Sequence, residues 1–128
     1  MLKVIPMSDP REQERVCLTA GIGYDKNQFA YGMYEDDAII GACQFYVKDG
    51  CGYISDLKII STEEDNKLAL AMLLGRSVLN FLDLHGTKEA YFEKNGEFYD
   101  KAARAIGFKN KEGRHYAFLD GMFTAHEH

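Results

Sequence analysis

The segment best suited to binding an anion is STEEDNKLALAMLLGRSVLNFLDLHG, residues 61–86. A predicted strand leads into a predicted helix, whose first turn points free backbone N–H groups outward and can therefore hold a phosphate. The same turn carries three acids that compete for those groups and repel a phosphate, namely Glu63, Glu64 and Asp65. Lys67 supplies one nearby cation. Two interpretations stay open: a phosphate site, or a helix capped by its own acids.

The sequence gives weaker indications of metal binding and of thiol chemistry. His126 and His128 end the chain in AHEH, but two histidines on a tail are more typical of adventitious metal binding than of a built site. The three cysteines, Cys17, Cys43 and Cys51, are odd in number and lack CxxC spacing. They predict reduced thiols in a cytoplasmic protein, with no disulfide frame and no metal site.

Composition narrows the class of protein. A chain of 128 residues predicts one domain with a single core, and 46% hydrophobic with 27% charged residues is ordinary for a globular protein. The formal net charge of −5, without a basic stripe, argues against a nucleic-acid partner. No apolar run approaches the roughly 18 residues that cross a bilayer, so no membrane association is expected.

The first half of the chain predicts a helix among antiparallel strands. Asp9 as cap and Pro10 at the first helical position begin a helix that ends near Gly21. An acidic turn at Glu35–Asp37 joins two strands, and alternation puts Phe29, Tyr31 and Met33 on one face. The predicted strands are residues 2–7, 27–34, 38–47 and 53–60.

The second half predicts a long helix, a strand, a shorter helix and a last strand. Ser61 and Glu64 form a capping box for the helix that ends at His85–Gly86. Its expected apolar stripe is Leu70, Leu73, Leu74, Ser77, Val78 and Phe81. Residues 87–93 then form a strand, 96–106 a helix with Asn95 as cap and Gly107 as end, and 114–120 a strand. The order β-α-β-β-β-α-β-α-β predicts an α/β or α+β fold, a mixed sheet with helices on its faces.

This order, together with AIIGACQFYV, YISDLKIISTEEDNKLALAMLL and ARAIGF, resembles the GCN5-related N-acetyltransferases (GNAT) over nearly the whole chain. The resemblance implies one GNAT-like domain over residues 1–128, with a mostly antiparallel central sheet. It also implies acetyl-CoA as co-substrate and transfer of the acetyl group to an amine by direct attack. The cofactor would lie between the strand at 53–60 and the strand at 87–93.

The resemblance also implies a set of cofactor-binding residues. Backbone groups around Ile59 would hold the pantetheine arm, and the amides of residues 67–70 would meet the pyrophosphate. The family's loop, Gln/Arg-x-x-Gly-x-Gly/Ala, falls on Glu64, Lys67 and Ala69, of which only Ala69 conforms. A Cβ at Lys67 hinders the close approach that a glycine permits. The implied cofactor-binding residues are Leu57, Ile59, Lys67, Leu68, Ala69, Leu70 and Asn95.

Three residues are candidates for catalysis in the implied reaction. Many family members place a tyrosine four residues before Gly-Phe to protonate the departing thiolate, but that position holds Ala103. Tyr99 lies one turn earlier and is either a displaced acid or a packing residue. Asp56 or Glu93 is the candidate base for the ammonium proton, and a salt-bridged strand residue is the alternative for each.

A second function stays open: a degenerate GNAT-fold protein without catalysis that binds a ligand or a partner. If the protein is an enzyme, its acceptor is expected to be a small-molecule or peptide amine. Five tyrosines are candidates either for lining an acceptor pocket or for packing, at positions 24, 31, 34, 46 and 53. Exposed edge strands make a homodimer a further expectation.

Overall fold

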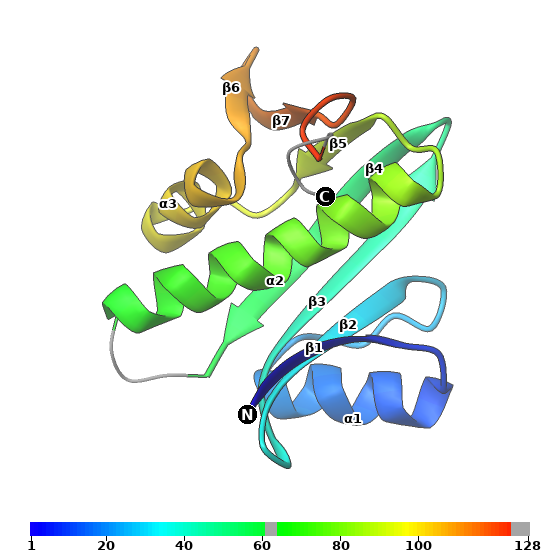
Figure 1. Cartoon of the computed structure of the whole chain (residues 1–128), viewed down its shortest axis with the longest axis vertical. Helices are drawn as coiled ribbons and strands as arrows, with labels where there is room; N and C mark the ends of the chain where they lie inside the picture. The colour runs from blue at the N-terminus through cyan, green and yellow to red at the C-terminus, as the bar shows by residue number, and fades with distance from the viewer. Residues whose placement is uncertain (61–63, 124–128) are drawn as a thin grey trace.

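The computed structural model describes residues 1–60 and 64–123. Seven strands form one sheet in the order β1-β2-β3-β4-β5-β7-β6, and β4 and β5 make its parallel pair (Figure 1). The mixed, mostly antiparallel sheet confirms the predicted fold class. The elements are β1 Leu2–Met7, α1 Pro10–Ala20, β2 Phe29–Glu35, β3 Ala38–Lys48, β4 Cys51–Ile59, α2 Glu64–Leu84, β5 Glu89–Phe92, α3 Glu97–Ile106, β6 Lys109–Lys111 and β7 Arg114–Phe118.

The ends of α1 are set by local chemistry, as predicted. The carboxylate of Asp9 accepts a hydrogen bond from the N–H of Arg11 at 3.1 Å, and Pro10 opens the helix. Gly21 closes it in the left-handed conformation, with φ of 90°. These contacts satisfy backbone groups that the helix leaves without partners, so the short helix begins and ends where the sequence indicates.

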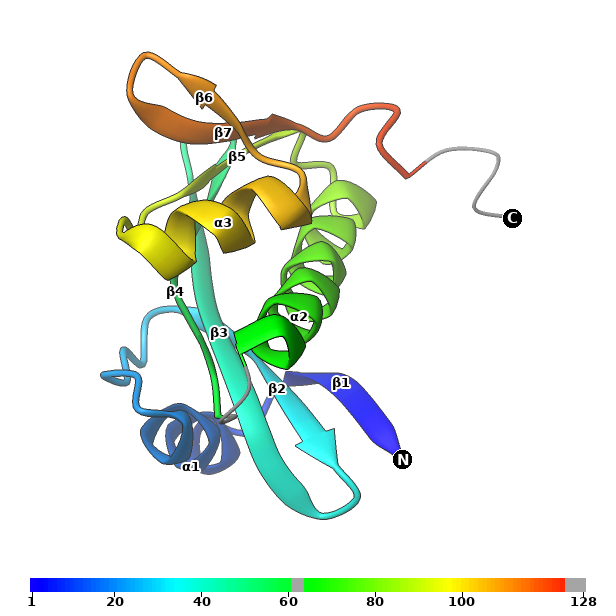
Figure 2. The same ribbon diagram turned by 90° about the vertical axis from the view of Figure 1, so that its left-hand side faces the viewer.

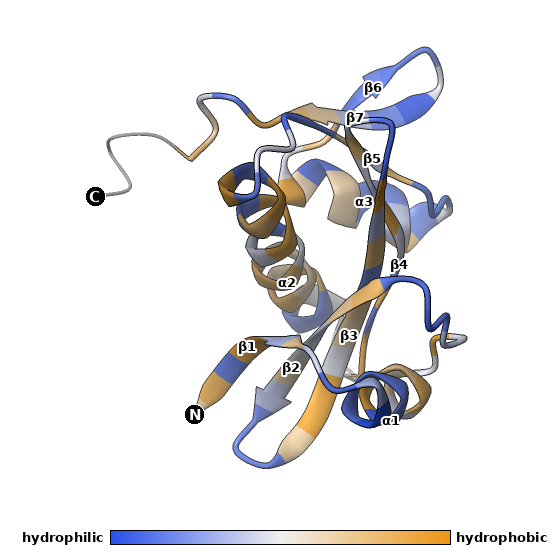
Figure 3. Cartoon of the chain, turned by 90° about the vertical axis from the view of Figure 1, so that its right-hand side faces the viewer, coloured by the Kyte–Doolittle hydropathy of each residue, from blue (hydrophilic) through white to orange (hydrophobic). Residues whose placement is uncertain are grey.

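The predicted order lacked one strand. β6 pairs with β7 through a turn at Glu112 and Gly113, whose φ angles of 52° and 81° fit a tight hairpin. Its sequence, Lys-Asn-Lys, is entirely exposed and hydrophilic (Figure 3), so it carries no apolar alternation from which a strand could be predicted.

The helices form layers on both faces of the sheet. Figure 2 shows α1 on one side and α2 on the other. α1 packs in a small core with residues of β2 and β3, whereas α2 and α3 share the larger core on the opposite face. The part of the α1 face formed by the end of β3, β4, β5 and β7 lies beyond α1. Residues of β3, β4 and the chain after β5 line a hollow there.

The buried side of α2 is rotated from the predicted stripe. Leu74 and Val78 are fully buried as expected, but Leu73 is 41% exposed. The reason is α3, which crosses α2 so closely at Gly75 that a Cβ there would lie 2.3 Å from Cδ1 of Ile106. Fully or almost fully buried apolar residues of α2 are Ala71, Leu74, Val78, Leu79 and Leu82.

The predicted cap of α3 was wrong. The N-cap is Gly96, it makes no side-chain capping bond, and Asn95 lies outside the helix. The predicted capping box at Ser61 and Glu64 and the histidines of the tail lie outside the described residues and side chains. Within residues 1–60 and 64–123, no helix is long and apolar enough to span a membrane.

Candidate functional site

The central feature of the sheet is the place where β4 and β5 part. The two strands pair only between Cys51–Ile54 and Glu89–Phe92. A last hydrogen bond runs from the N–H of Glu93 to the carbonyl of Ile54 at 2.9 Å. β4 then continues to Ile59, while the chain after β5 turns toward α3. The parted strands leave one side of β4 without a strand neighbour.

A β-bulge lies at the point of separation. Gln44 pairs with Asp56 and Phe45 with Ile54, so Ser55 is an extra residue in β4. Beyond it, the N–H of Ile60 donates to the carbonyl of Ile40 at 2.7 Å and therefore faces β3. Because backbone groups alternate in direction along a strand, those of Leu57 and Ile59 face the opening.

Two of the predicted cofactor-binding residues can act there through their backbones alone. The side chains of Leu57 and Ile59 are 0% and 8% exposed and belong to the larger core. Packing of these side chains fixes β4 in place. The N–H of Leu57 donates to Oδ1 of Asp56 at 2.8 Å. The C=O of Leu57 and the N–H and C=O of Ile59 face the opening and stay available. Peptide groups that border an opening in this way suit an extended ligand that carries amides.

The start of α2 lies just beyond β4. Because α2 begins at Glu64, the amides without intrahelical acceptors are those of its first turn, residues 64–67. The predicted phosphate-facing stretch, residues 67–70, overlaps this turn at Lys67, whose side chain is half-buried. Leu68 and Leu70 pack against the core, and Ala69 is exposed.

Asp56 and Tyr99 lie near each other at the opening. The Asp56 side chain is 15% exposed, with Nζ of Lys94 at 3.5 Å. The same ammonium lies 6.0 Å from the centre of the Tyr99 ring. Burial, and secondly the charge of Asp56, raises the pKa of Tyr99, so this phenol stays protonated at neutral pH. Lys94 was not predicted as part of the site because its pairing depends on the separation of the strands.

The position where the resemblance places a tyrosine is buried in the core. Ala103 is fully buried in the core shared by α2 and α3. Its carbonyl accepts hydrogen bonds from the N–H groups of Gly107 and Phe108 at the end of α3. The helix therefore presents no hydroxyl there, and Tyr99 is the phenol of α3.

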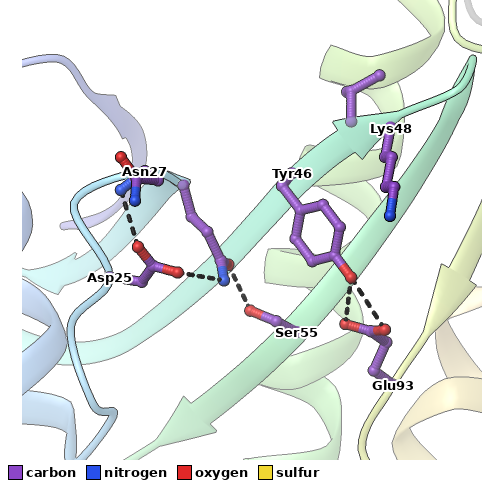
Figure 4. Close-up of a pocket in the computed structure, with 8 residues that line it drawn as sticks. Asp25, Asn27, Tyr46, Lys48, Ser55 and Glu93 are labelled. Carbon is purple, nitrogen blue, oxygen red and sulfur yellow. Dashed lines mark hydrogen bonds between the residues drawn. The ribbon is translucent and has the colours of Figure 1, made fainter.

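A polar hollow of about 510 Å³ lies beyond α1 on the other face of the sheet (Figure 4). The end of β3 contributes Tyr46 and Lys48, the bulge contributes Ser55, and the chain after β5 contributes Glu93. The remaining wall is the loop between α1 and β2. In this loop, Asp25, Asn27 and Gln28 line the hollow.

Glu93 is held in this hollow by Tyr46. The Tyr46 hydroxyl lies 3.0 Å from both carboxylate oxygens of Glu93 and donates to them. Burial, and then the hydrogen bond to Glu93, raises the pKa of Tyr46, which keeps the hydroxyl a donor. Tyr46 in turn stacks on Tyr53 at 5.0 Å between centroids, and Tyr53 on Tyr91 at 5.6 Å. This row of rings across β3, β4 and β5 braces the carboxylate.

The other predicted residues are not gathered at one point. Asn95 lies beside the β6–β7 turn, in hollows shared with Gly113 and His115. Of the five tyrosines expected at an acceptor pocket, Tyr46 lines the polar hollow, whereas Tyr31 and Tyr34 are each only 8% exposed. The described cysteines are free, and no group of described residues could hold a metal ion.

No family model and no curated protein matches this sequence. Solved structures do match it. An N-acetyltransferase from Staphylococcus aureus Mu50 superposes with a TM-score of 0.69 at 11% identity, over 94% of this chain and 99% of that one. A GNAT family acetyltransferase from Brucella melitensis, in complex with acetyl-CoA, gives 0.62 at 12% identity, over 92% and 88%.

The ribosomal-protein-S18-alanine N-acetyltransferase from Escherichia coli gives a TM-score of 0.63 at 9% identity, over 92% of this chain and 90% of that chain. At sequence identities this low, the superpositions show a shared fold but do not show a shared activity. The chain therefore has the fold of the GCN5-related N-acetyltransferases, as the resemblance of its sequence predicted.

Proposed function

We propose that this protein is an acyl-CoA-dependent N-acyltransferase that transfers an acetyl group from acetyl-CoA to an amine. The observation that carries the proposal is the parting of β4 and β5 after Ile54, which leaves backbone groups of Leu57 and Ile59 facing an opening. The pantetheine arm of acetyl-CoA is an extended chain with two amides, so it can pair with such groups as an added strand would.

The phosphates would lie at the first turn of α2. Free amides there and the cation of Lys67 suit an anion, and no glycine is needed if the phosphates approach the end of the helix and not its side. When bound, acetyl-CoA supplies the acyl group as an activated thioester. Leu57 and Ile59 would orient it through their backbones, while the core beneath them excludes water.

Two carboxylates border the parting strands and are the proposed bases. Asp56 lies at the bulge beside Lys94, and Glu93 lies at the last rung between β5 and β4. One of them accepts the proton that the ammonium loses, which frees the nitrogen lone pair to form the N–C bond. Tyr99 is the proposed donor of a proton to the sulfur as the C–S bond breaks.

Titration calorimetry with acetyl-CoA, 3′-dephospho-CoA and pantetheine tests the cofactor site. We expect acetyl-CoA to bind with micromolar affinity, and pantetheine, which lacks the pyrophosphate, to bind at least tenfold more weakly. Lys67→Glu should lower the affinity for acetyl-CoA and leave the affinity for pantetheine unchanged. Lys109→Glu on the exposed, distant strand β6 is the matched charge reversal and should change neither. Absence of heat and of thermal stabilisation with millimolar acetyl-CoA would refute the proposal.

The alternative, a binding module without catalysis, is favoured by one observation. The position where the resemblance places a tyrosine holds Ala103, which is fully buried, so α3 has no hydroxyl at that position. Single-turnover assays separate the two functions once binding is shown. Tyr99→Phe should slow thiol release at least tenfold if Tyr99 is the acid, whereas a protein that binds acetyl-CoA but releases no thiol with any amine is a binding module.

A further inference from the structure

We propose that the polar hollow beside Glu93 is the acceptor site and that it takes an amine which also carries a carboxylate, that is, an amino acid. This inference rests on the proposed function and names its substrate class. It is carried by three observations: which charged groups in the hollow are already engaged, which are available, and where the available ones lie relative to the parting strands.

Asp25 is engaged within its own loop. Its carboxylate accepts hydrogen bonds from the N–H of Asn27 at 2.9 Å and from the amide of Gln28 at 3.2 Å. The loop is anchored beneath, where the buried Gln44 accepts from the N–H of Asp25 at 2.8 Å and donates to the carbonyl of Gly23 at 2.7 Å. Asp25 therefore shapes the wall, and withdrawing its carboxylate for a ligand would break the turn.

Glu93 and Lys48 are the charges left for a ligand. Glu93 is exposed, and among the described residues its carboxylate accepts a side-chain hydrogen bond from the hydroxyl of Tyr46 alone, so it can still accept from an ammonium. Lys48 is exposed and forms no ion pair with any described residue. Beside the carboxylate of Asp25, which keeps its charge but is turned into its own loop, the hollow thus offers the anion of Glu93 and the cation of Lys48. A diamine would complement the first and repel the second, whereas an amino acid complements both.

The positions of the two charges set the orientation of the ligand. The N–H of Glu93 makes the last hydrogen bond to β4, at the carbonyl of Ile54, so an ammonium bound by Glu93 lies where the strands part. Lys48 is two residues beyond Tyr46 on the same face of β3, about 6.6 Å along the strand. Figure 4 shows its side chain extending along Tyr46 in the direction of Glu93. The amino group then faces the cofactor opening and the carboxylate faces away.

Competition between matched acceptors tests this assignment. Phenylalanine, leucine and lysine are each compared with the amine that decarboxylation would give, namely phenethylamine, isoamylamine and cadaverine, by kcat/KM for thiol release from acetyl-CoA. Because amines differ in basicity, the readout is the change in each ratio between variants. We expect Lys48→Met to lower the preference for the carboxylate at least tenfold and Lys48→Glu to favour cadaverine over lysine.

Glu93→Gln should lower kcat/KM for both members of each pair, since both present an ammonium. Lys3→Met, on the distant edge strand β1, is the matched control and should leave every ratio unchanged. Lys48 is exposed, so its variants should keep the thermal midpoint of the natural protein. Ratios that stay the same in Lys48→Met would overturn the assignment while leaving the transferase function intact.

A binding measurement separates this inference from the function on which it rests. Titration of ¹⁵N-labelled protein with phenylalanine should shift the amide signals of Tyr46, Lys48 and Ser55, and phenethylamine should bind more weakly. If these shifts appear but no amine is acetylated, the hollow binds amino acids and the transferase proposal fails. If neither the shifts nor transfer to any amino acid is seen, the assignment is overturned as well.

Discussion

The crossing of α2 and α3 gives a direct test of the fold, because Gly75 lies where the helices touch. In Gly75→Ala the new Cβ would come within 2.3 Å of Cδ1, 2.5 Å of Cγ1 and 3.1 Å of Cγ2 of Ile106. Ile106 is 0% exposed and surrounded by core residues, so its side chain has no free space to enter. The helices must therefore separate or Ile106 must leave its rotamer.

The expected magnitude comes from two opposing terms. Replacing glycine by alanine inside a helix stabilises the folded state by about 1 kcal/mol. The overlap is about 1 Å relative to an ordinary contact of 3.4 Å, and overpacking of this kind costs about 1–3 kcal/mol. Because three atoms of Ile106 are involved, the upper part of this range applies, and we expect a net loss of about 1–2 kcal/mol. With an unfolding entropy of about 0.27 kcal/mol/K for 128 residues, the thermal midpoint should fall by about 4–7 °C.

Thermal and urea unfolding measure the effect, and a double variant assigns its cause. Ile106→Ala removes the atoms that clash, so adding Gly75→Ala to that variant should be neutral or stabilising. Asn80→Ala, on the exposed side of α2, is the control and should change stability by only a few tenths of a kcal/mol. A Gly75→Ala protein as stable as the natural one, or one equally destabilised with and without Ile106, would refute the reasoning.

Two further predictions concern ionisable groups. The hydrogen bond to Glu89, at 2.8 Å, and secondly burial raise the pKa of Tyr116 from 10.0 to about 12. The protonated phenol therefore stabilises the folded state fully below pH 10, and this contribution is lost as the pH rises through about 12. Glu89→Ala should return this pKa toward 10 in an NMR titration, and an unchanged value would contradict the assignment. Cys17 and Cys43 are 0% exposed and burial raises the pKa of both thiols, whereas Cys51 is half-buried. A maleimide should therefore label Cys51 first in the native protein and almost nothing in Cys51→Ser, and equal labelling of all three would show that the core opens.

Local chemistry made several elements predictable. Asp9, Pro10 and Gly21 act through contacts within α1, so they predicted both of its ends. Period-two alternation placed Phe29, Tyr31 and Met33 on one face of β2, which packs toward α2. The long helix predicted between two strands agrees with the parallel pairing of β4 with β5, since a helix returns the chain so that the next strand can run in the same direction. Where local signals were weak, as in the hydrophilic β6, the prediction failed.

The candidate site was predictable only in part. The types of Asp56, Glu93 and Tyr99 suggested acid–base chemistry from the sequence. Their surroundings did not follow from it: Asp56 lies beside Lys94, while Glu93 is held by Tyr46 across the sheet. Both arrangements join residues distant in the sequence, and neither leaves a periodic pattern that could be recognised.

The sequence by itself thus determined the described elements other than β6, their order and the class of fold, because hydrophobic periodicity and capping residues act over a few neighbouring positions. Tertiary structure decided where those elements separate. The bulge at Ser55 and the parting of β4 from β5 involve strands that pair across the sheet, Leu57 and Ile59 fit a core shared with both helices, and α3 crosses α2 at Gly75. These are long-range packing constraints, and they place the opening, the bordering carboxylates and the polar hollow with Lys48 in relation to one another.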